Sequence, residues 1–335
     1  MTAGHKILLI RPDHLGDVIL SLPVAETLKN HWPDSRIHYF SAAGPANLQG
    51  MTDYVDGWII DENSNGTELW LFQLAKIFRM GGFDILIELK PSWRTAVAGF
   101  LSGIPIRIGT SRRFYSIFYN RYVNLHRRAS GKHQTDLDLA LLKPLGINYT
   151  GILPSIRLSE TNREKAKTLL TGVSYPYIVI HPGCGGSTTN WPLENYRQLA
   201  KLILQRTEYA VVITGNNDKI GEFENCIVLN GKTDIESLAG ILAGASLFIS
   251  VGTGPLHLAD ALGTKCMAFF TNRRGIEPAR WGPRRNMENI LVSPIAACRC
   301  PDSRSCRCLE QILPESAFNK IESILGIAGC GTAKK

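Results

Sequence analysis

Two segments of this chain open in the same way, and that repetition limits the folds it can adopt. Lys6–Arg11 (KILLIR) is a short apolar run that leads through a glycine-containing loop into the helical pattern Val18–Asn30. Tyr177–His181 (YIVIH) leads in the same way into Leu193–Gln205. A buried strand, a turn and a helix in this order begin a parallel α/β domain. The sequence therefore predicts two such domains.

Further apolar stretches follow both openings at the spacing of strand–helix–strand units. The predicted strands are Arg36–Phe40, Gly57–Ile60, Ile85–Glu88 and Arg107–Gly109 in the first half, and Ala210–Thr214, Cys226–Val228, Leu247–Val251 and Cys266–Phe270 in the second. The predicted helices between them are Glu68–Arg79, Thr95–Leu101, Leu137–Leu145, Glu236–Leu242 and Pro255–Leu262. We expect domains over residues 1–155 and 156–313, joined near Thr150–Ser155, with a ligand cleft at the carboxyl ends of their strands.

Length and composition exclude several other classes of protein. The 335 residues are 44% hydrophobic with a formal net charge of +8, as in a globular rather than a disordered chain. The longest weakly polar run, Leu238–Val251, falls short of the roughly 20 residues of a membrane-spanning helix. The apolar run Ile7–Ile10 is too short for a secretory signal, and the eight cysteines are too unevenly spaced for a disulfide framework. We expect a cytoplasmic protein with no transmembrane segment.

The first loop places a carboxylate at the start of a helix. Asp17 follows Gly16 and falls in the first helical turn. It is either a helix cap, worth about 0.5–2 kcal/mol, or a general base that projects into the cleft. Asp13 and His14 are further candidates in the same loop.

The loop after Tyr177–His181 is rich in glycine and hydroxyl side chains. Its glycines, which let backbone N–H groups approach a ligand closely, are Gly183, Gly185 and Gly186. Its hydroxyl side chains, which add hydrogen-bond donors, are those of Ser187, Thr188 and Thr189. The loop is a phosphate cradle or a glycine-rich turn without a ligand. It lacks the lysine of a P-loop NTPase, and no GxGxxG is present to support a nicotinamide-dependent oxidoreductase.

A second turn of this kind follows Leu247–Val251. Gly252, Thr253 and Gly254 precede a helix that begins near Pro255, and His257 lies one turn into it. Two anion-binding helix starts in one domain suit a ligand that contains a diphosphate.

The first half contains a long stretch of positive charge. Between Leu89 and Thr135 there are nine Lys or Arg and no Asp or Glu, with aromatic side chains interleaved. Charge of one sign over such a length favours an anionic partner over a merely solvated face. The candidates are nucleic acid, a phosphorylated glycolipid and an anionic membrane surface. No nucleic-acid-binding motif is present, so we expect no nucleic-acid partner.

Four cysteines lie close together near the end of the chain. Cys298, Cys300, Cys306 and Cys308 form a CxC…CxC pattern. Thiolates in this arrangement can hold zinc or iron, but zinc ligands are usually separated by two to four residues. Free thiols are therefore favoured, and no metal is predicted.

Taken together, these segments resemble the ADP-heptose:lipopolysaccharide heptosyltransferase family, glycosyltransferase family 9, over nearly the whole chain. The segments that carry the similarity are Leu15–Val18, Leu22-Pro23, Phe83–Arg94, Phe118–Arg121, His181–Gly183, Trp191-Pro192, Gly252–His257 and Cys308–Ile312. Their order and spacing together are specific.

The resemblance implies a GT-B fold, in which two Rossmann-like domains with parallel sheets face a central cleft. It implies that residues 314–335, with the helix Pro314–Leu325, pack back toward the first domain. It also implies an inverting, metal-independent enzyme that needs no cofactor. Such an enzyme moves a heptose or a similar sugar from an ADP-sugar, typically ADP-heptose, to a lipopolysaccharide-core glycolipid, with Asp17 as general base.

The two loops, the basic stretch and the resemblance together predict the binding residues. Those for the nucleotide sugar are Gly183, Ser187, Thr188, Thr189, Gly215, Thr233, Gly252, Thr253, Gly254 and His257. Those for an anionic acceptor, at the inner face of the cytoplasmic membrane, are Arg11, Lys90, Arg94, Arg112, Arg113 and Arg121.

Two positions depart from the family pattern. Family members commonly carry Lys at the position of Thr189 and Asp at that of Gly252. Arg273, Arg274 or Arg280 could supply the missing cation at a diphosphate. The alternatives are a glycosyltransferase of the same fold with another nucleotide sugar or a protein acceptor, and a nucleotide-sugar-binding relative without turnover.

Overall fold

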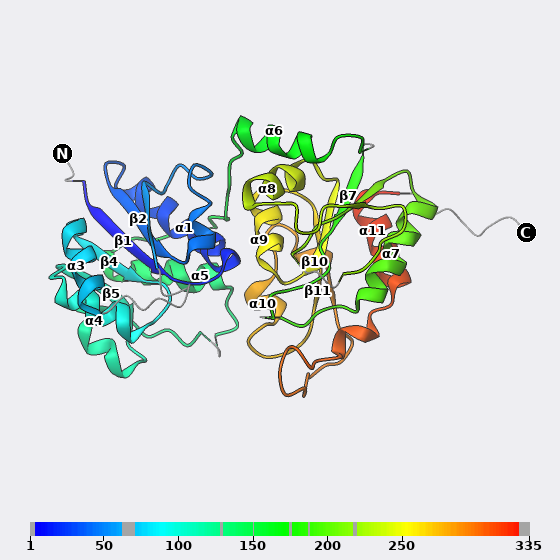
Figure 1. Cartoon of the computed structure of the whole chain (residues 1–335). Coiled ribbons are helices and arrows are strands. Elements are labelled where there is room, and N and C mark those ends of the chain that lie inside the picture. The colour runs from blue at the N-terminus through cyan, green and yellow to red at the C-terminus, as the bar shows by residue number, and fades with distance from the viewer. Residues whose placement is uncertain are drawn as a thin grey trace, which may run out of the picture. The chain divides into compact units, whose positions relative to one another are not determined.

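The computed structural model describes residues 4–61, 71–127, 130–149, 151–173, 176–186, 188–216 and 220–327. The chain forms two compact units, Met1–Ser155 and Ile156–Lys335, which run from blue to green and from green to red in Figure 1. Each unit holds a six-stranded sheet whose neighbouring strands all pair in parallel. The predicted α/β class with two parallel sheets is confirmed.

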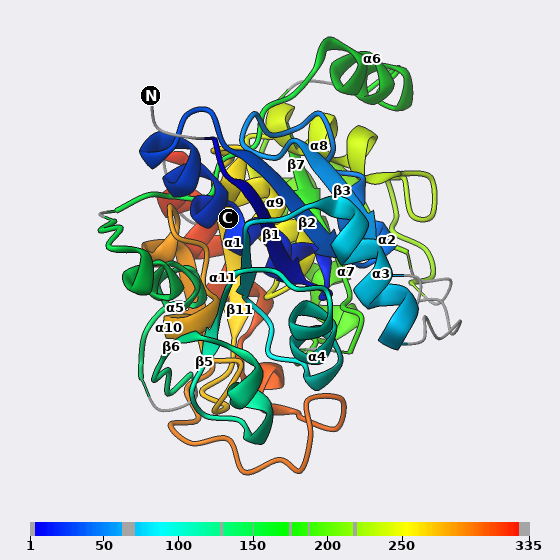
Figure 2. The same cartoon turned by 90° about the vertical axis from the view of Figure 1, so that its left-hand side faces the viewer.

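The first sheet has the strand order β3-β2-β1-β4-β5-β6. Its strands are β1 (Lys6–Arg11), β2 (Arg36–Ser41), β3 (Gly57–Ile60), β4 (Ile85–Glu88), β5 (Ile106–Thr110) and β6 (Arg121–Val123). Figure 2 shows β1, β2 and β3 side by side in this unit. The chain order reverses between β1 and β4, and parallel sheets bind ligands at the carboxyl ends of strands at such a point.

The second sheet has the order β12-β11-β10-β7-β8-β9, which is the same winding. Its strands are β7 (Tyr177–Ile180), β8 (Ala210–Ile213), β9 (Ile227–Val228), β10 (Leu247–Val251), β11 (Cys266–Phe270) and β12 (Ile290–Val292). Here the order reverses between β7 and β10. Both are fully buried, as expected of central strands covered by helices on each side.

Helices connect the strands in both units (Figure 1). In the first unit they are α1 (Leu15–His31), α2 (Ala43–Ala46), α3 (Leu71–Gly81), α4 (Trp93–Leu101), α5 (Gln134–Leu139) and the 3₁₀ helices η2 (Phe114–Phe118) and η3 (Ala140–Leu145). In the second unit they are α6 (Glu160–Leu169), α7 (Leu193–Arg206), α8 (Ile235–Gly244), α9 (Gly254–Ala261), α10 (Pro278–Trp281), α11 (Pro314–Leu325) and the 3₁₀ helices η4 (Met287–Asn289) and η5 (Cys308–Gln311). The start of the helix predicted from Glu68 lies outside the described residues.

Several elements were not predicted. The strands β6 and β12 have three residues each and lie at sheet edges, where short strands give little periodic signal. Helix α6 is strongly polar, so its sequence shows only a weak apolar face. A capping box between Ser159 and Asn162 starts it, and Gly240 lets it approach α8, because a Cβ there would lie 2.5 Å from the Asn162 carbonyl oxygen.

The last helix packs within its own unit. The family resemblance implies that α11 returns toward the first domain. Its buried residues Ala317, Phe318 and Ile321 belong to the core of the second unit, where α11 packs on α7, and a return toward the first domain stays a prediction. The apolar face of α11 is buried there, because the apolar face of α7 packs against it.

Candidate active site

A buried arginine organises the end of β1. The guanidinium of Arg11 is 1% exposed and lies among three carboxylates. Its Nη2 donates to Asp17 Oδ1 at 2.9 Å, its Nη1 lies 3.1 Å from Asp138 Oδ2, and its Nε lies 3.2 Å from Asp13 Oδ2. Lys90, which follows β4, pairs with Asp13 at 2.7 Å. These contacts join the carboxyl ends of β1 and β4 at the switch point of the first sheet.

Asp138, on α5, fixes the position of Arg11. Its side chain is fully buried, pairs also with Arg127 at 3.2 Å and accepts from Gln134 at 2.9 Å. Burial lowers the pKa of Arg11, but Asp138 and the other two carboxylates outweigh it, so the pKa is raised overall. Arg11 therefore stays charged. This pair could not be predicted from the sequence, because Arg11 and Asp138 stand 127 residues apart.

Asp17 is held by Arg11 and does not serve as the helix cap. The N-cap of α1 is His14, which makes no side-chain capping bond, and Asp17 lies in the first turn. The Asp17 side chain is 21% exposed, compared with 9% for Asp13 and none for Asp138. Burial raises the pKa of Asp17 although Arg11 opposes the shift. A carboxylate with a raised pKa is a stronger base, and this one has access to solvent.

A second buried carboxylate closes β4. Glu88 is fully buried, and Thr95 on α4 donates a hydrogen bond to its Oε1. Burial raises the pKa of Glu88 well above its usual value, and the Tyr119 side chain also interacts with it. The Tyr119 ring reaches this place because Gly109 has no side chain, since a Cβ there would lie 2.3 Å from the ring. These bonds fix the turn that carries Lys90.

Three loops of the second unit leave neighbouring strands at one sheet edge. Gly183 follows β7, Gly215 follows β8 and Thr253 follows β10, and the sheet order places β7 between β8 and β10. The amide of Gly231 donates to the carbonyl of Gly215 at 2.8 Å. This bond holds the segment that carries Thr233 and leads into α8 next to the same sheet edge. Gly183 has a φ of 132°, in the left-handed region that favours glycine. The predicted residues Gly183, Gly215 and Thr253 are thus brought to one edge of the sheet.

The N-terminus of α9 has an unused hydroxyl. Thr253 is the N-cap of α9 and is buried, yet its side chain makes no capping bond. Its Oγ1 has no hydrogen-bond partner among the described residues. Thr normally uses this oxygen to cap the helix, and a buried hydroxyl without a partner costs free energy. The positive end of the α9 dipole and this hydroxyl together suit an anionic ligand.

A model of glycosyltransferase family 9 (heptosyltransferase) matches residues 71–310. The chain belongs to glycosyltransferase family 9. It is 26% identical to a candidate glycosyltransferase of Haemophilus influenzae over 95% of this chain and 96% of that protein. It is 25% identical to lipopolysaccharide heptosyltransferase 3 of Escherichia coli K12 over 76% of this chain and 79% of the relative.

Solved structures show the same fold. The glycosyltransferase of family 9 from Veillonella parvula matches with a TM-score of 0.80 and 22% identity, over 98% of this chain and 99% of that one. The E. coli heptosyltransferase WaaC with ADP matches with a TM-score of 0.70 and 20% identity, over 95% of this chain and 99% of that one. The predicted GT-B class and glycosyltransferase activity are therefore confirmed.

One departure from the family pattern has a steric explanation. Gly252 precedes Thr253, where family members commonly have Asp. A Cβ at Gly252 would lie 2.9 Å from the Phe270 ring at the end of β11. Phe270 is 2% exposed, so its ring fills the space that a carboxylate side chain would need.

The other residues predicted to bind the donor lie in or near the same loops. Thr188 and Thr189 are buried, Gly254 begins α9, and His257 is 5% exposed within it. Burial lowers the pKa of His181, at the end of β7, to about 4, so it is neutral at pH 7. Ser187 lies outside the described residues. Contact of these side chains with a donor remains a prediction.

The predicted acceptor residues separate into two groups. Arg11 does not fit a direct acceptor contact, because it is buried and faces three carboxylates; it positions Asp17 instead. Arg94 pairs with Asp61 and is largely buried. The exposed members of the set are Lys90, Arg112, Arg113 and Arg121.

Around η2 the exposed arginines stand among exposed apolar side chains. Phe114 is 85% exposed and Ile117 is 80% exposed, although both are large hydrophobic residues. Tyr115 and Tyr119 of the same segment are buried and anchor it. Among the described residues, no helix is long and apolar enough to cross a bilayer.

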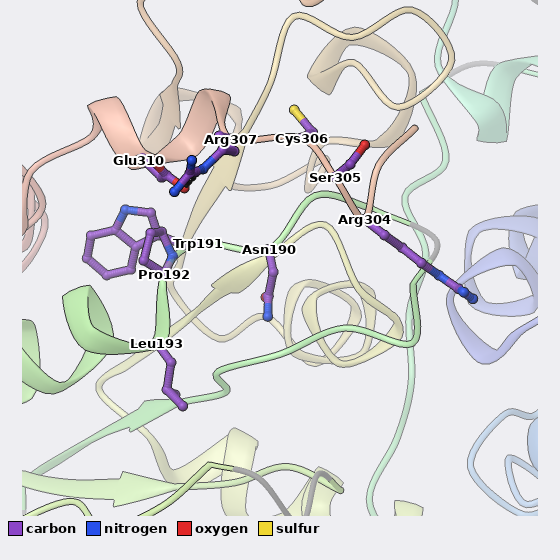
Figure 3. A pocket seen from close by; sticks show the side chains of 9 residues that line it. All are labelled: Asn190, Trp191, Pro192, Leu193, Arg304, Ser305, Cys306, Arg307 and Glu310. Atoms are coloured by element: carbon purple, nitrogen blue, oxygen red, sulfur yellow. Dashed lines mark hydrogen bonds and ion pairs between the residues drawn. The ribbon is translucent and has the colours of Figure 1, made fainter. Parts of the chain in front are cut away.

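A hollow of about 430 Å³ adjoins the glycine-rich loop (Figure 3). It is lined by Asn190, Trp191, Pro192, Leu193, Arg304, Ser305, Cys306, Arg307 and Glu310. Figure 3 shows Arg304, Ser305 and Cys306 on one late segment, and Arg307 pairs with Glu310 at 2.7 Å. Of the cations considered for the diphosphate, Arg273 donates instead to the carbonyls of Cys300 and Pro301. The approach of residues 300–310 to the glycine-rich loop could not be predicted from the sequence.

Proposed function

We propose that this family 9 glycosyltransferase moves a heptose from ADP-heptose to a lipopolysaccharide-core glycolipid, with inversion at the anomeric carbon. The observation that carries the proposal is Asp17, a partly exposed carboxylate held by the buried Arg11 at the switch point of the first sheet. The names of a relative, lipopolysaccharide heptosyltransferase 3, and of a neighbour that binds ADP support the donor and acceptor.

Asp17 is proposed as the general base. Its free oxygen would take the proton of an acceptor hydroxyl as that oxygen attacks the anomeric carbon. A new carbon–oxygen bond forms there, the bond from carbon to the diphosphate breaks, and ADP leaves with the electron pair. Attack opposite the leaving group inverts the anomeric centre. Arg11 keeps Asp17 oriented, and burial keeps its pKa raised.

The second unit is proposed to bind the nucleotide sugar. The diphosphate would accept from the Thr253 hydroxyl and from the first amides of α9, which would also offset the charge that develops on ADP without a metal ion. Thr233, before α8, would face the nucleoside. The buried hydroxyl of Thr253 would then gain the hydrogen-bond partner that it lacks among the described residues.

The η2 surface is proposed to meet the acceptor at a membrane. Arg112 and Arg113 offer positive charge, and Phe114 and Ile117 offer apolar side chains that can enter the interfacial region of a bilayer. An anionic glycolipid presents both kinds of partner. On this proposal the protein is cytoplasmic and binds the inner face of the membrane peripherally.

The first experiment compares Asp17→Asn with Thr253→Val. Both are close in shape to the original residues. ADP release would be measured with ADP-heptose and a truncated lipopolysaccharide acceptor, and ADP binding by calorimetry. Asp17→Asn should lower kcat at least about 100-fold with little change in the Kd of ADP. Thr253→Val should raise that Kd about tenfold with an unchanged or higher Tm.

Normal turnover by Asp17→Asn would remove Asp17 as the base. Unchanged ADP affinity in Thr253→Val would remove the α9 site. Release of UDP or GDP from other sugar donors, with no release of ADP from ADP-heptose, would support a glycosyltransferase but contradict ADP-heptose as its donor.

A further inference from the structure

The four late cysteines converge in space. Their sulfur atoms all lie within 4.8 Å of one another, although the segment that carries them has little regular structure. Cys298 Sγ lies 3.5 Å from Cys306 Sγ, and Cys300 Sγ lies 3.9 Å from Cys308 Sγ. Cys306 and Cys308 are buried. None of the four is in a disulfide.

These separations match those of a tetrahedral metal centre. Zinc binds thiolate sulfur at about 2.3 Å, which places the four sulfurs of a regular tetrahedron about 3.8 Å apart. The Cys298–Cys306 and Cys300–Cys308 sulfur separations, 3.5 and 3.9 Å, lie on either side of that value. A disulfide would require about 2.05 Å, so each pair would have to move closer by well over an ångström.

We propose that Cys298, Cys300, Cys306 and Cys308 bind one Zn²⁺ as thiolates. Four protein ligands leave no open position, which is the arrangement of structural rather than catalytic zinc. Each thiol would release its proton on binding, and the resulting centre would carry a net charge of −2. The arginines at 299, 304 and 307, within the same segment, supply compensating positive charge.

Hydrogen bonds around the cluster hold the segment in place. Arg273 donates to the carbonyl of Cys300 at 2.7 Å, and Ser293 Oγ donates to the carbonyl of Cys308 at 2.8 Å. Ser303 Oγ donates to the carbonyl of Gly186 at 3.1 Å, in the glycine-rich loop after β7. The sequence spacing, with one residue inside each pair, obscured this site because the loop between the pairs folds back on itself.

The metal would stabilise two loops, residues 298–308 and the glycine-rich loop after β7. It would fix residues 298–308, and through Ser303 it would steady the loop that carries Gly183 and Gly186. This consequence rests on the proposed function only where it concerns nucleotide binding. The metal site itself is independent of the donor.

The test uses the full chain, purified without a histidine tag and without added chelator. Elemental analysis should find about one zinc per chain, and X-ray absorption at the zinc edge should find four sulfurs at about 2.3 Å. Titration with a mercurial reagent should release the zinc into a metallochromic dye. Cys306→Ser should lose most of the bound zinc. Cys226→Ser, at a half-buried cysteine outside the cluster, should keep it.

Other outcomes would overturn the proposal. Zinc-free protein with about four fewer titratable thiols would show two disulfides instead. Iron at the site, with the visible absorption of an iron–thiolate centre, would overturn zinc as the metal. Because the wild-type measurements need no variant, a folding failure of Cys306→Ser would not decide the result. One bound zinc per chain together with no ADP binding would contradict the proposed donor site and still support the metal site.

Discussion

Replacement of Arg11 by methionine probes the central ion cluster of the first unit. Methionine has a similar length but no charge, so it leaves Asp17 and Asp13 without the guanidinium that lies 2.9 and 3.2 Å from them. Asp138 is fully buried and, among the described residues, pairs with Arg11 and Arg127. In Arg11→Met it would keep the Arg127 pair and lose the other. Removal of one partner from a buried ion pair costs about 3–5 kcal/mol. We expect Arg11→Met to lose about that much unfolding free energy at pH 7.

The dependence on pH distinguishes charge from packing. Without Arg11, the pKa of Asp17 in the folded protein should rise further above its ordinary value of 3.8. A carboxyl group with a raised folded pKa destabilises the protein where it is ionised, and this penalty vanishes once the pH falls below the unfolded pKa. The difference between wild type and Arg11→Met should therefore shrink as the pH is lowered from 7 toward 4.

The assay is urea unfolding at several pH values, because guanidinium chloride would screen the charges. Arg112→Met is the matched control, since Arg112 is exposed and its side chain hydrogen-bonds, within the described part of the chain, to Asn124 and His126. It should change stability by less than about 0.5 kcal/mol. A loss in Arg11→Met below about 1 kcal/mol, or one that does not vary with pH, would refute the role assigned to the cluster.

Three further results are expected. Burial lowers the pKa of His181 from 6.5 to about 4, so wild-type unfolding free energy should fall as pH drops through this range, and His181→Asn should flatten that slope in urea titrations; equal slopes would contradict it. Gly252→Ala should lose about 1–3 kcal/mol, because its Cβ would lie 2.9 Å from Phe270; an unchanged Tm would mean that the ring yields freely. Trp191→Phe should lose about 1–3 kcal/mol, because the indole donates to the Ile312 carbonyl at 2.9 Å; calorimetry showing wild-type stability would refute this.

Local sequence patterns determined the architecture. The apolar runs KILLIR and YIVIH are central strands, and the turns after β1, β7 and β10 fall where the residues predicted them. Such patterns work because a strand buried on both faces needs consecutive apolar residues, and a tight turn needs glycine. They failed for the polar helix α6, whose position depends on its contact with α8 rather than on its own apolar face.

The roles of individual side chains needed the tertiary structure. Asp17 was singled out from the sequence, but its orientation depends on Arg11, and that of Arg11 on Asp138 far along the chain. The free hydroxyl of Thr253 and the convergence of four cysteines were equally invisible, because each depends on which distant segments pack together. Apolar periodicity is a property of neighbouring residues and survives in the sequence. Which polar side chains meet depends on how distant segments pack, so it is determined only in the tertiary structure.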